Sequence, residues 1–260
     1  MISNPVLRKE LAGNVRMRQL PRVARVGCLL LIASLIGTIY YYVIVRFILA
    51  DRGTTTAVDT WHVVVILQAA LICLISPSIA ANSITREKEQ QTWEMLLFTM
   101  LQPSQIVFGK LLARLYYLGL MILIFMPIEL ACWAKASNEI TTAMVALTYL
   151  VMAVSALCFT TISLYVSWVV KRTIYSIMSG YSIVIGGLVI CTSLSAAVVN
   201  GSLANNPLMW INPILMFGQA IDPHIVTGGD LTVAIITYLL ATALMLTRMI
   251  IRLRDFSLEA

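Results

Sequence analysis

Long apolar segments without charged residues recur along this chain of 260 residues. A helix needs about 20 mostly apolar residues to cross the roughly 30 Å of hydrocarbon in a bilayer. Five uncharged runs suit this length, and a weaker sixth, between Lys110 and Lys135, is interrupted only by Arg114 and Glu129. We therefore predict an all-α polytopic membrane protein with a single transmembrane domain over residues 1–260. The six predicted transmembrane helices are 26–45, 63–84, 111–134, 140–170, 173–199 and 231–250.

The composition excludes a water-soluble fold. The chain is 60% hydrophobic and only 12% charged, whereas soluble domains carry about 25% charged residues. Its net charge of +6 does not indicate nucleic-acid binding, because the basic residues lie at predicted helix ends and not on a soluble face with interleaved aromatics. The five cysteines lie one apiece in separate apolar segments without a CxxC pair. We predict that they are small membrane-core residues rather than redox or metal sites.

The positions of the basic residues predict the orientation. Short cytoplasmic loops of membrane proteins carry an excess of Lys and Arg. With the N-terminus inside, only Arg46, Arg52 and Lys135 of the 18 basic residues fall in outer segments. Both termini are therefore predicted to be cytoplasmic, and the protein is predicted to lie in the cytoplasmic (inner) membrane as a multi-pass protein.

Two further segments are predicted to lie at the membrane surface. Residues 206–221 are apolar but short and contain two prolines, so a re-entrant or interfacial segment on the outer side fits better than a seventh span. In residues 1–22, Leu7, Leu11 and Val15 recur every four residues among several cations. This pattern favours an amphipathic elbow helix under the anionic inner leaflet, with a merely basic, frayed terminus as the alternative.

The connection between the second and third predicted spans, residues 85–105, is long and charged. Trp93, Leu96, Leu97, Met100 and Leu101 recur with helical spacing, which predicts an amphipathic helix at the inner membrane surface. We expect Pro103 to end this helix and Ser104 to cap the next one, forming a cytoplasmic hairpin. A polar face of both signs favours docking of a cytoplasmic protein, and a solvated loop is the alternative. The charged residues of this face are Arg86, Glu87, Lys88, Glu89 and Glu94.

Two motifs resemble the type-2, exporter-class permease subunits of ABC transporters. NPVLRKEL, Asn4–Leu11, is similar to the N-terminal elbow of that family. Residues 84–115 are similar to its pattern of acidic residues, a Thr-x-Glu-x-Leu-Leu step, a Pro and a Gly-Lys. That step begins here at Thr92, and Gln91 stands where the family usually has Gly.

The resemblance implies a coupling helix, Arg86 to about Met95, that docks on a separate cytoplasmic ABC ATPase subunit. It also implies a second permease copy, as a homo- or heterodimer, and ATP and Mg bound by the partner ATPase. The residues implied in coupling are Arg86, Glu87, Lys88, Glu89, Gln90, Thr92 and Glu94, and those implied at the membrane interface are Leu7, Leu11, Trp93, Leu96 and Leu97.

Polar residues inside the predicted spans are the candidates for a translocation path. Gln68, Ser76 and Asn82 follow one another in the second predicted span, and Glu129 is the one acidic residue near a span interior. Interhelical hydrogen bonds explain the first three equally well, and Lys135 nearby favours the outer interface for Glu129.

The sequence does not predict an enzyme. Lys110 follows Gly109 but precedes Leu111, so no GxxxxGK[ST] phosphate-binding loop is present, and HExxH is also absent. We therefore expect no cofactor in this chain and an export permease driven by a separate ATPase. A stand-alone secondary transporter and a membrane scaffold or sensor are the alternatives, and the substrate has no readable signature.

Overall fold

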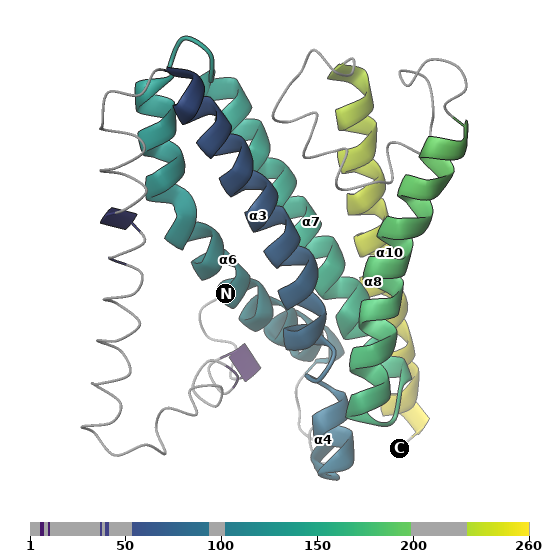
Figure 1. The fold of residues 1–260 in the computed structure, drawn as a ribbon. Helices are drawn as coiled ribbons and strands as arrows, with labels where there is room; N and C mark the ends of the chain where they lie inside the picture. Colours follow the sequence, from purple (N-terminus) through teal and green to yellow (C-terminus); the bar gives the residue numbers. More distant parts are fainter. Residues whose placement is uncertain are drawn as a thin grey trace, which may run out of the picture.

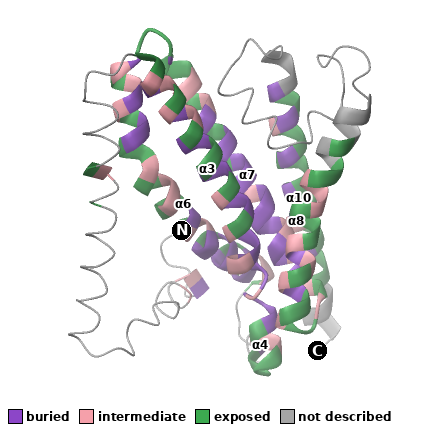
Figure 2. Ribbon diagram, viewed as in Figure 1, coloured by how far each residue is buried: buried purple, intermediate pink, exposed green. Residues whose placement is uncertain are grey.

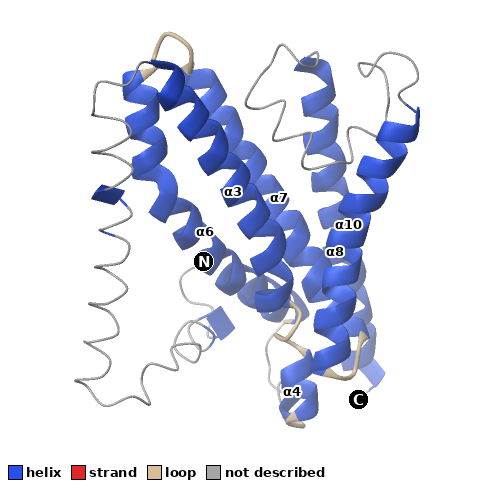
Figure 3. Ribbon diagram, in the orientation of Figure 1, coloured by secondary structure: helices blue, strands red, loops and turns tan. Residues whose placement is uncertain are grey.

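The computed structural model describes residues 54–93, 102–198 and 228–259, together with Val6, Leu7, Glu10, Gly37, Tyr40 and Tyr41. Within these residues every regular element is a helix, as Figure 3 shows. The first predicted span, residues 26–45, and the predicted outer segment, residues 206–221, lie outside the described ranges, apart from three residues of the former. The helices are α3 (Thr54–Ala80), α4 (Thr85–Glu89), α6 (Pro103–Lys135), α7 (Thr142–Val169), α8 (Thr173–Val198) and α10 (Gly228–Glu259).

Five helices of the described part are long and apolar enough to cross a membrane. They are α3, whose candidate span continues through a turn into α4, and then α6, α7, α8 and α10. This confirms the prediction of an all-helical multi-pass membrane protein within the described residues. The sixth span and the orientation stay predictions.

The observed helix ends differ from the predicted ones where local polarity was misleading. α7 and α8 agree with the predicted spans to within two residues, whereas α3 begins at Thr54, nine residues before the predicted start. Trp61 lies in this added segment and is buried, so tertiary packing extends the helix past its polar start. The predicted cap at Ser104 is wrong: Pro103 occupies the first turn and Gln102 is the N-cap, without a side-chain hydrogen bond.

The core lies around α7. This helix packs against α3, α6, α8 and α10, and Figure 2 shows its buried residues in purple. Its small polar side chains are satisfied within the helix itself: Thr148 and Ser163, for example, each donate to the carbonyl oxygen four residues earlier. Because these bonds satisfy the Thr and Ser hydroxyls within the helix, a sequence with several Ser and Thr residues can still form the centre of the bundle.

Large apolar side chains cover the outside of the bundle. Leu123 of α6, Met178 of α8 and Leu240 of α10 are among those that are more than half exposed. A water-soluble monomer rarely exposes so many large apolar residues together. These surfaces fit contact with lipid tails or with another membrane-embedded subunit.

The basic residues of the described part gather at one end of the bundle, the lower end in Figure 1, where α4 also lies. Only Lys135 lies at the opposite end among the described basic residues, close to the connection between α6 and α7. The basic residues on which the prediction of the cytoplasmic side rests therefore lie together at one end of the bundle. The residues at the lower end are Arg86, Lys88, Lys110, Arg114, Lys171, Arg172, Arg248, Arg252 and Arg254.

Gly180 marks the close approach of α8 to α3. A Cβ atom at this position would lie 3.5 Å from Ala81 Cβ and 3.6 Å from Pro77 Cβ, whereas one at Gly186 on the same helix would meet nothing within 4 Å. Small residues in membrane helices permit such close packing. Larger side chains are therefore excluded at Gly180 but not at Gly186 in this bundle.

We predict that Gly180→Leu destabilises the bundle by about 1–3 kcal/mol, because the added side chain must separate α8 from α3. The measurement is the thermal unfolding midpoint of the purified chain in detergent. Gly186→Leu is the matched control and is expected to leave the midpoint nearly unchanged. Equal midpoints for the two variants would contradict this packing.

Candidate functional site

The connection between α3 and α6 begins with a short helix and a sharp turn. α4 ends at Glu89, and the backbone turns at Gln90 and Gln91 before helical geometry resumes at Thr92. Gln91 has a φ of 56°, a left-handed conformation that no right-handed helix can contain. The expectation of one continuous helix from Arg86 to about Met95 is therefore wrong. Residues 94–101, which include Glu94, Leu96 and Leu97, lie outside the described residues.

The turn gives a physical reason for the sequence difference noted at Gln91. Glycine adopts positive φ without steric cost, whereas other L-residues pay roughly 1–2 kcal/mol there. The glycine usual in the resembling family would fit the conformation that this chain forces on glutamine. Gln91 thus differs from the family pattern at a position whose backbone geometry favours glycine.

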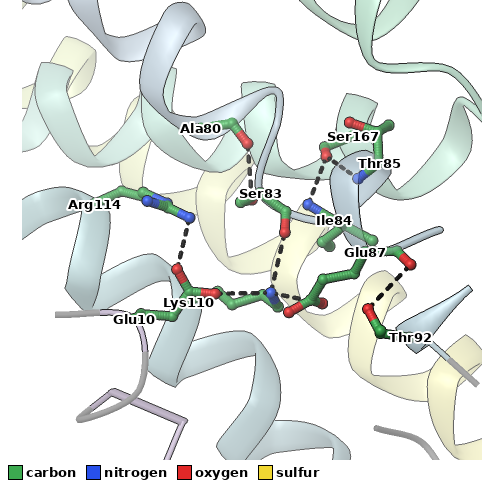
Figure 4. Close-up of polar contacts among 10 residues, drawn as sticks. All are labelled: Glu10, Ala80, Ser83, Ile84, Thr85, Glu87, Thr92, Lys110, Arg114 and Ser167. Carbon is green, nitrogen blue, oxygen red and sulfur yellow. Dashed lines mark hydrogen bonds and ion pairs between the residues drawn. The ribbon is translucent and has the colours of Figure 1, made fainter. Parts of the chain in front are cut away.

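The N-terminus of α4 is fixed by α7. Ser167 Oγ accepts hydrogen bonds from the backbone N–H groups of Ile84 and Thr85, at 3.0 and 3.1 Å (Figure 4). These are among the N–H groups that a helix start leaves without partners in its own backbone. Ser167 is fully buried, so this contact ties the start of α4 directly to the end of the central helix.

Lys88 and Glu89 fix the other side of α4. Lys88 Nζ donates to the carbonyl oxygens of Trp168 and Val170 at the end of α7. Glu89 accepts hydrogen bonds from Thr173 N–H at 2.7 Å and from Thr173 Oγ1 at 2.8 Å, at the start of α8. These hydrogen bonds stabilise the carboxylate and lower the pKa of Glu89. α4 therefore supplies hydrogen-bond partners to backbone groups at the end of α7 and the start of α8.

A buried lysine joins α4 to α6 and to the N-terminal segment. Lys110 Nζ lies 2.8 Å from Glu87 Oε2, 3.0 Å from Glu10 Oε1 and 3.0 Å from the Ser83 carbonyl oxygen. The Lys110 side chain is 1% exposed, and the second Glu10 oxygen accepts a 2.7 Å hydrogen bond from Arg114. Figure 4 shows these side chains converging beneath the end of α3. We call Glu10, Glu87, Lys110 and Arg114 the ion cluster.

The structure divides the residues implied in coupling into two groups. Glu87 and Lys88 turn toward the bundle and are engaged by Lys110 and by the end of α7. Arg86, Glu89, Gln90 and Thr92 are exposed, together with Gln91. The charged face is thus not wholly available to a partner, contrary to the expectation from the sequence. The physical reason is that the helix-end carbonyls and Lys110 need those charges.

The apolar residues of the hairpin pack on protein. Trp93 is 9% exposed and belongs to a cluster with Val6, Ile84, Ile106 and Met249. Leu7 is half-buried, and Leu11 lies outside the described residues. The apolar stripe expected to face the membrane therefore contributes, at Trp93, to the packing of the hairpin against α6 and α10.

The structure does not bring the four path candidates together. Gln68 and Ser76 are buried in α3, where Gln68 Nε2 donates to the Ile122 carbonyl oxygen at 3.2 Å. Asn82 is half-buried at the end of α3 and lines a cleft there. Glu129 is 1% exposed within the bundle. Its position at the outer membrane interface stays a prediction, and the structure adds that the side chain is covered by protein.

Sequence reasoning missed the partners that hold α4 in place. Ser167 and Thr173 carry no motif, and their roles depend on where the ends of α7 and α8 meet α4. Lys110 and Arg114 gave a signal, because two cations one helical turn apart interrupt an otherwise apolar span. Glu10, the one acidic residue in the basic N-terminal segment, completes the cluster.

Comparison with known families gives one match across most of the chain. The profile described as "ABC-2 family transporter protein" matches residues 8–253. This range includes the hairpin and all the described membrane-length helices except the end of α10. No curated protein has a sequence that matches significantly.

We predict that Gln91→Gly stabilises the protein by about 0.5–1 kcal/mol, because glycine relieves the left-handed strain and offsets its own greater loss of chain entropy. The readout is again the unfolding midpoint of the purified chain. Gln90→Gly is the control, since Gln90 has a φ of −84° and gains nothing from glycine. A midpoint that falls equally in both variants would show that the turn is not strained.

We also predict that Lys110→Met destabilises the protein by about 3–5 kcal/mol, because Glu87 and Glu10 lose their shared, buried cation. Lys171→Met removes an exposed lysine at the same end and should change stability by less than about 0.5 kcal/mol. Adding Glu10→Gln and Glu87→Gln to Lys110→Met should recover part of the loss. Chemical denaturation in detergent provides the comparison, and equal loss in both lysine variants would refute the buried role.

Proposed function

The chain belongs to the ABC-2 family of transporter proteins, and from this premise we propose that it is the membrane-spanning permease subunit of an ATP-binding-cassette exporter. A separate cytoplasmic ABC ATPase binds ATP and Mg and supplies the energy. The chain itself contributes the membrane path and the surface on which the ATPase docks.

One observation carries this proposal: α4 is a protruding element that is tied to three helices of the bundle. It lies at the lower end of the molecule in Figure 1, beyond the ends of α7 and α8. Ser167, Lys88 and Glu89 connect it to those helices, and Lys110 connects it to α6. Movement imposed on such an element passes to the spans, which is what coupling to an ATPase requires.

The docking surface that we propose is the exposed tip of the hairpin. Arg86, Glu89, Gln90, Gln91 and Thr92 are exposed there, and they combine two opposite charges with amide and hydroxyl groups. Surfaces of this polar type give specificity and orientation to protein–protein contacts. The half-buried Glu87 and Lys88 act behind this surface and hold its shape.

The proposed assembly contains a second permease copy, as a homo- or heterodimer. α8 supports this part of the proposal, because only 17% of its membrane-length window is buried within the chain and it exposes large apolar residues such as Ile174 and Met178. A second copy in the membrane can cover this face, and lipid covers what remains. The cytoplasmic side of the inner membrane is the proposed location of α4.

Gln90→Trp tests the docking surface. The bulky ring lies at an exposed position of the turn, so we expect at least a tenfold loss of ATPase co-purification with the tagged chain and of permease-stimulated ATP hydrolysis. The fold should survive, since the native Gln90 side chain is exposed. Asn138→Trp at the opposite end of the bundle is the matched control and should keep both properties.

The same two positions report the orientation. A cysteine introduced at Gln90 should react with a membrane-impermeant thiol reagent only after the cytoplasmic side is opened, and one at Asn138 should react in intact cells. The coupling proposal fails if the residue 90 thiol is labelled from outside. It also fails if Gln90→Trp retains full ATPase binding and stimulation.

A further inference from the structure

A cleft of about 570 Å³ lies where the end of α3, α4, α6 and Glu10 meet. This volume falls in the range of small-molecule binding pockets, which is roughly 300–1,000 Å³. Its walls include Ser78 and Asn82 from the end of α3, Arg86 and Gln90 from the hairpin, and Arg114 and Tyr117 from α6. The cleft is therefore separate from the membrane-buried Gln68 and Glu129 and adjoins the proposed docking tip.

The charges around the cleft leave a surplus of cationic groups. Glu10 and Glu87 both line the cleft, but Lys110 and Arg114 already neutralise them. Arg86 is the third cation, and it is exposed, with no ion pair to any acidic residue in the described part of the chain. The lining itself holds two cations and two carboxylates, and Lys110, which is not part of the lining, brings the total around the cleft to three cations and two carboxylates.

Arg114 is the second cation of the cleft lining and carries a donor that no described residue satisfies. Its side chain is 7% exposed, and one guanidinium nitrogen bonds Glu10. Its Nε is buried and has no hydrogen-bond partner among the described residues. A buried donor without a partner is costly, and guanidinium groups match phosphate oxygens in geometry. Asn82, Ser78 and the Tyr117 hydroxyl add neutral polar groups on the same walls.

The position of the cleft indicates which kind of phosphate-bearing molecule would fit it. Ser78 lies in the last turns of α3, where the apolar span gives way to the charged hairpin. Further along α6, Leu120 and Ile124, which follow Tyr117 by three and seven residues and so lie on its side of the helix, expose large apolar side chains. A molecule with a phosphate in the cleft and an apolar chain along this face satisfies both environments.

We propose that this cleft binds the phosphate group of an amphiphile, with Arg86 and Arg114 as its cationic contacts and Asn82 as a hydrogen-bond donor. The ligand lies directly against the hairpin, so its presence is sensed by the element that contacts the ATPase. Binding itself does not depend on the proposed ATPase coupling and is measurable on the permease alone.

The test is a lipid titration of the purified full-length chain in detergent, followed by native mass spectrometry. Phosphatidylglycerol should bind more tightly than diacylglycerol with the same acyl chains, because only the former carries a phosphate. Arg86→Gln should weaken phosphatidylglycerol binding about fivefold, the effect of one cation near an anionic headgroup. Ser78→Phe fills the cleft without removing a charge and should weaken binding at least as much.

Arg172→Gln removes an exposed cation at the same end but outside the cleft, and it should bind like the wild type. Competition with inorganic phosphate identifies the source of the anion. If inorganic phosphate at equal concentration displaces the bound lipid, the site is assigned to a soluble phosphate. If only phosphatidylglycerol displaces the bound lipid, the site is assigned to a lipid headgroup. The proposal is overturned if diacylglycerol binds equally well, if Arg86→Gln and Ser78→Phe both bind like the wild type, or if Arg172→Gln loses as much affinity. The ATPase is absent from this assay, so failure of the coupling proposal leaves its outcome unaffected.

Discussion

The pairing of Lys110 with two carboxylates is the interaction on which the lower half of the described structure depends. An ammonium group removed from water is costly unless close acidic partners compensate for its lost hydration. Lys110 has two such partners, and they come from different parts of the chain: Glu10 from the N-terminal segment and Glu87 from α4. The need to satisfy one buried cation therefore fixes the relative positions of the N-terminal segment, the hairpin and α6. Arg114, one turn further along α6, extends the same constraint by binding the second Glu10 oxygen.

The same requirement, applied to backbone groups, accounts for the geometry of α4. Helix ends leave N–H and C=O groups without partners in their own backbone. Where such groups are buried within the protein near the membrane surface, they need side-chain partners. Ser167 accepts from the start of α4, Lys88 donates to the end of α7, and Glu89 accepts from the start of α8. A connection of only a few residues thus satisfies two helix ends, and α7 satisfies the start of that connection through Ser167. A longer regular helix would not bring Lys88 or Glu89 closer to these partners. The short helix and the sharp turn are therefore consistent with the need of the helix ends for side-chain partners.

The membrane architecture could be predicted because hydrophobic length is a direct consequence of bilayer thickness. α7 and α8 begin and end almost where their uncharged runs do. The turn at Gln91 could not be predicted, because glutamine has no preference for positive φ and its neighbours continue the helical apolar spacing. The inward direction of Glu87 and Lys88 was equally hidden, since it depends on a lysine more than twenty residues away and on the end of α7. Sequence periodicity reports which face of a helix is apolar, but it does not report which charges the rest of the fold will require.

The strength of these connections determines how the proposed coupling can work. Hydrogen bonds to charged groups are stronger than those between neutral groups, and α4 is held by several of them at Lys88, Glu89 and Glu87. Detaching α4 from the bundle would require breaking them together, whereas moving α4 along with the ends of α6, α7 and α8 breaks none. A force applied at the tip is therefore expected to displace these helix ends as a unit. The turn at Gln90 and Gln91 lies beyond the connections and can adjust to the docking partner without loosening them. In this proposal recognition and transmission use adjacent residues of one hairpin and share only Glu89.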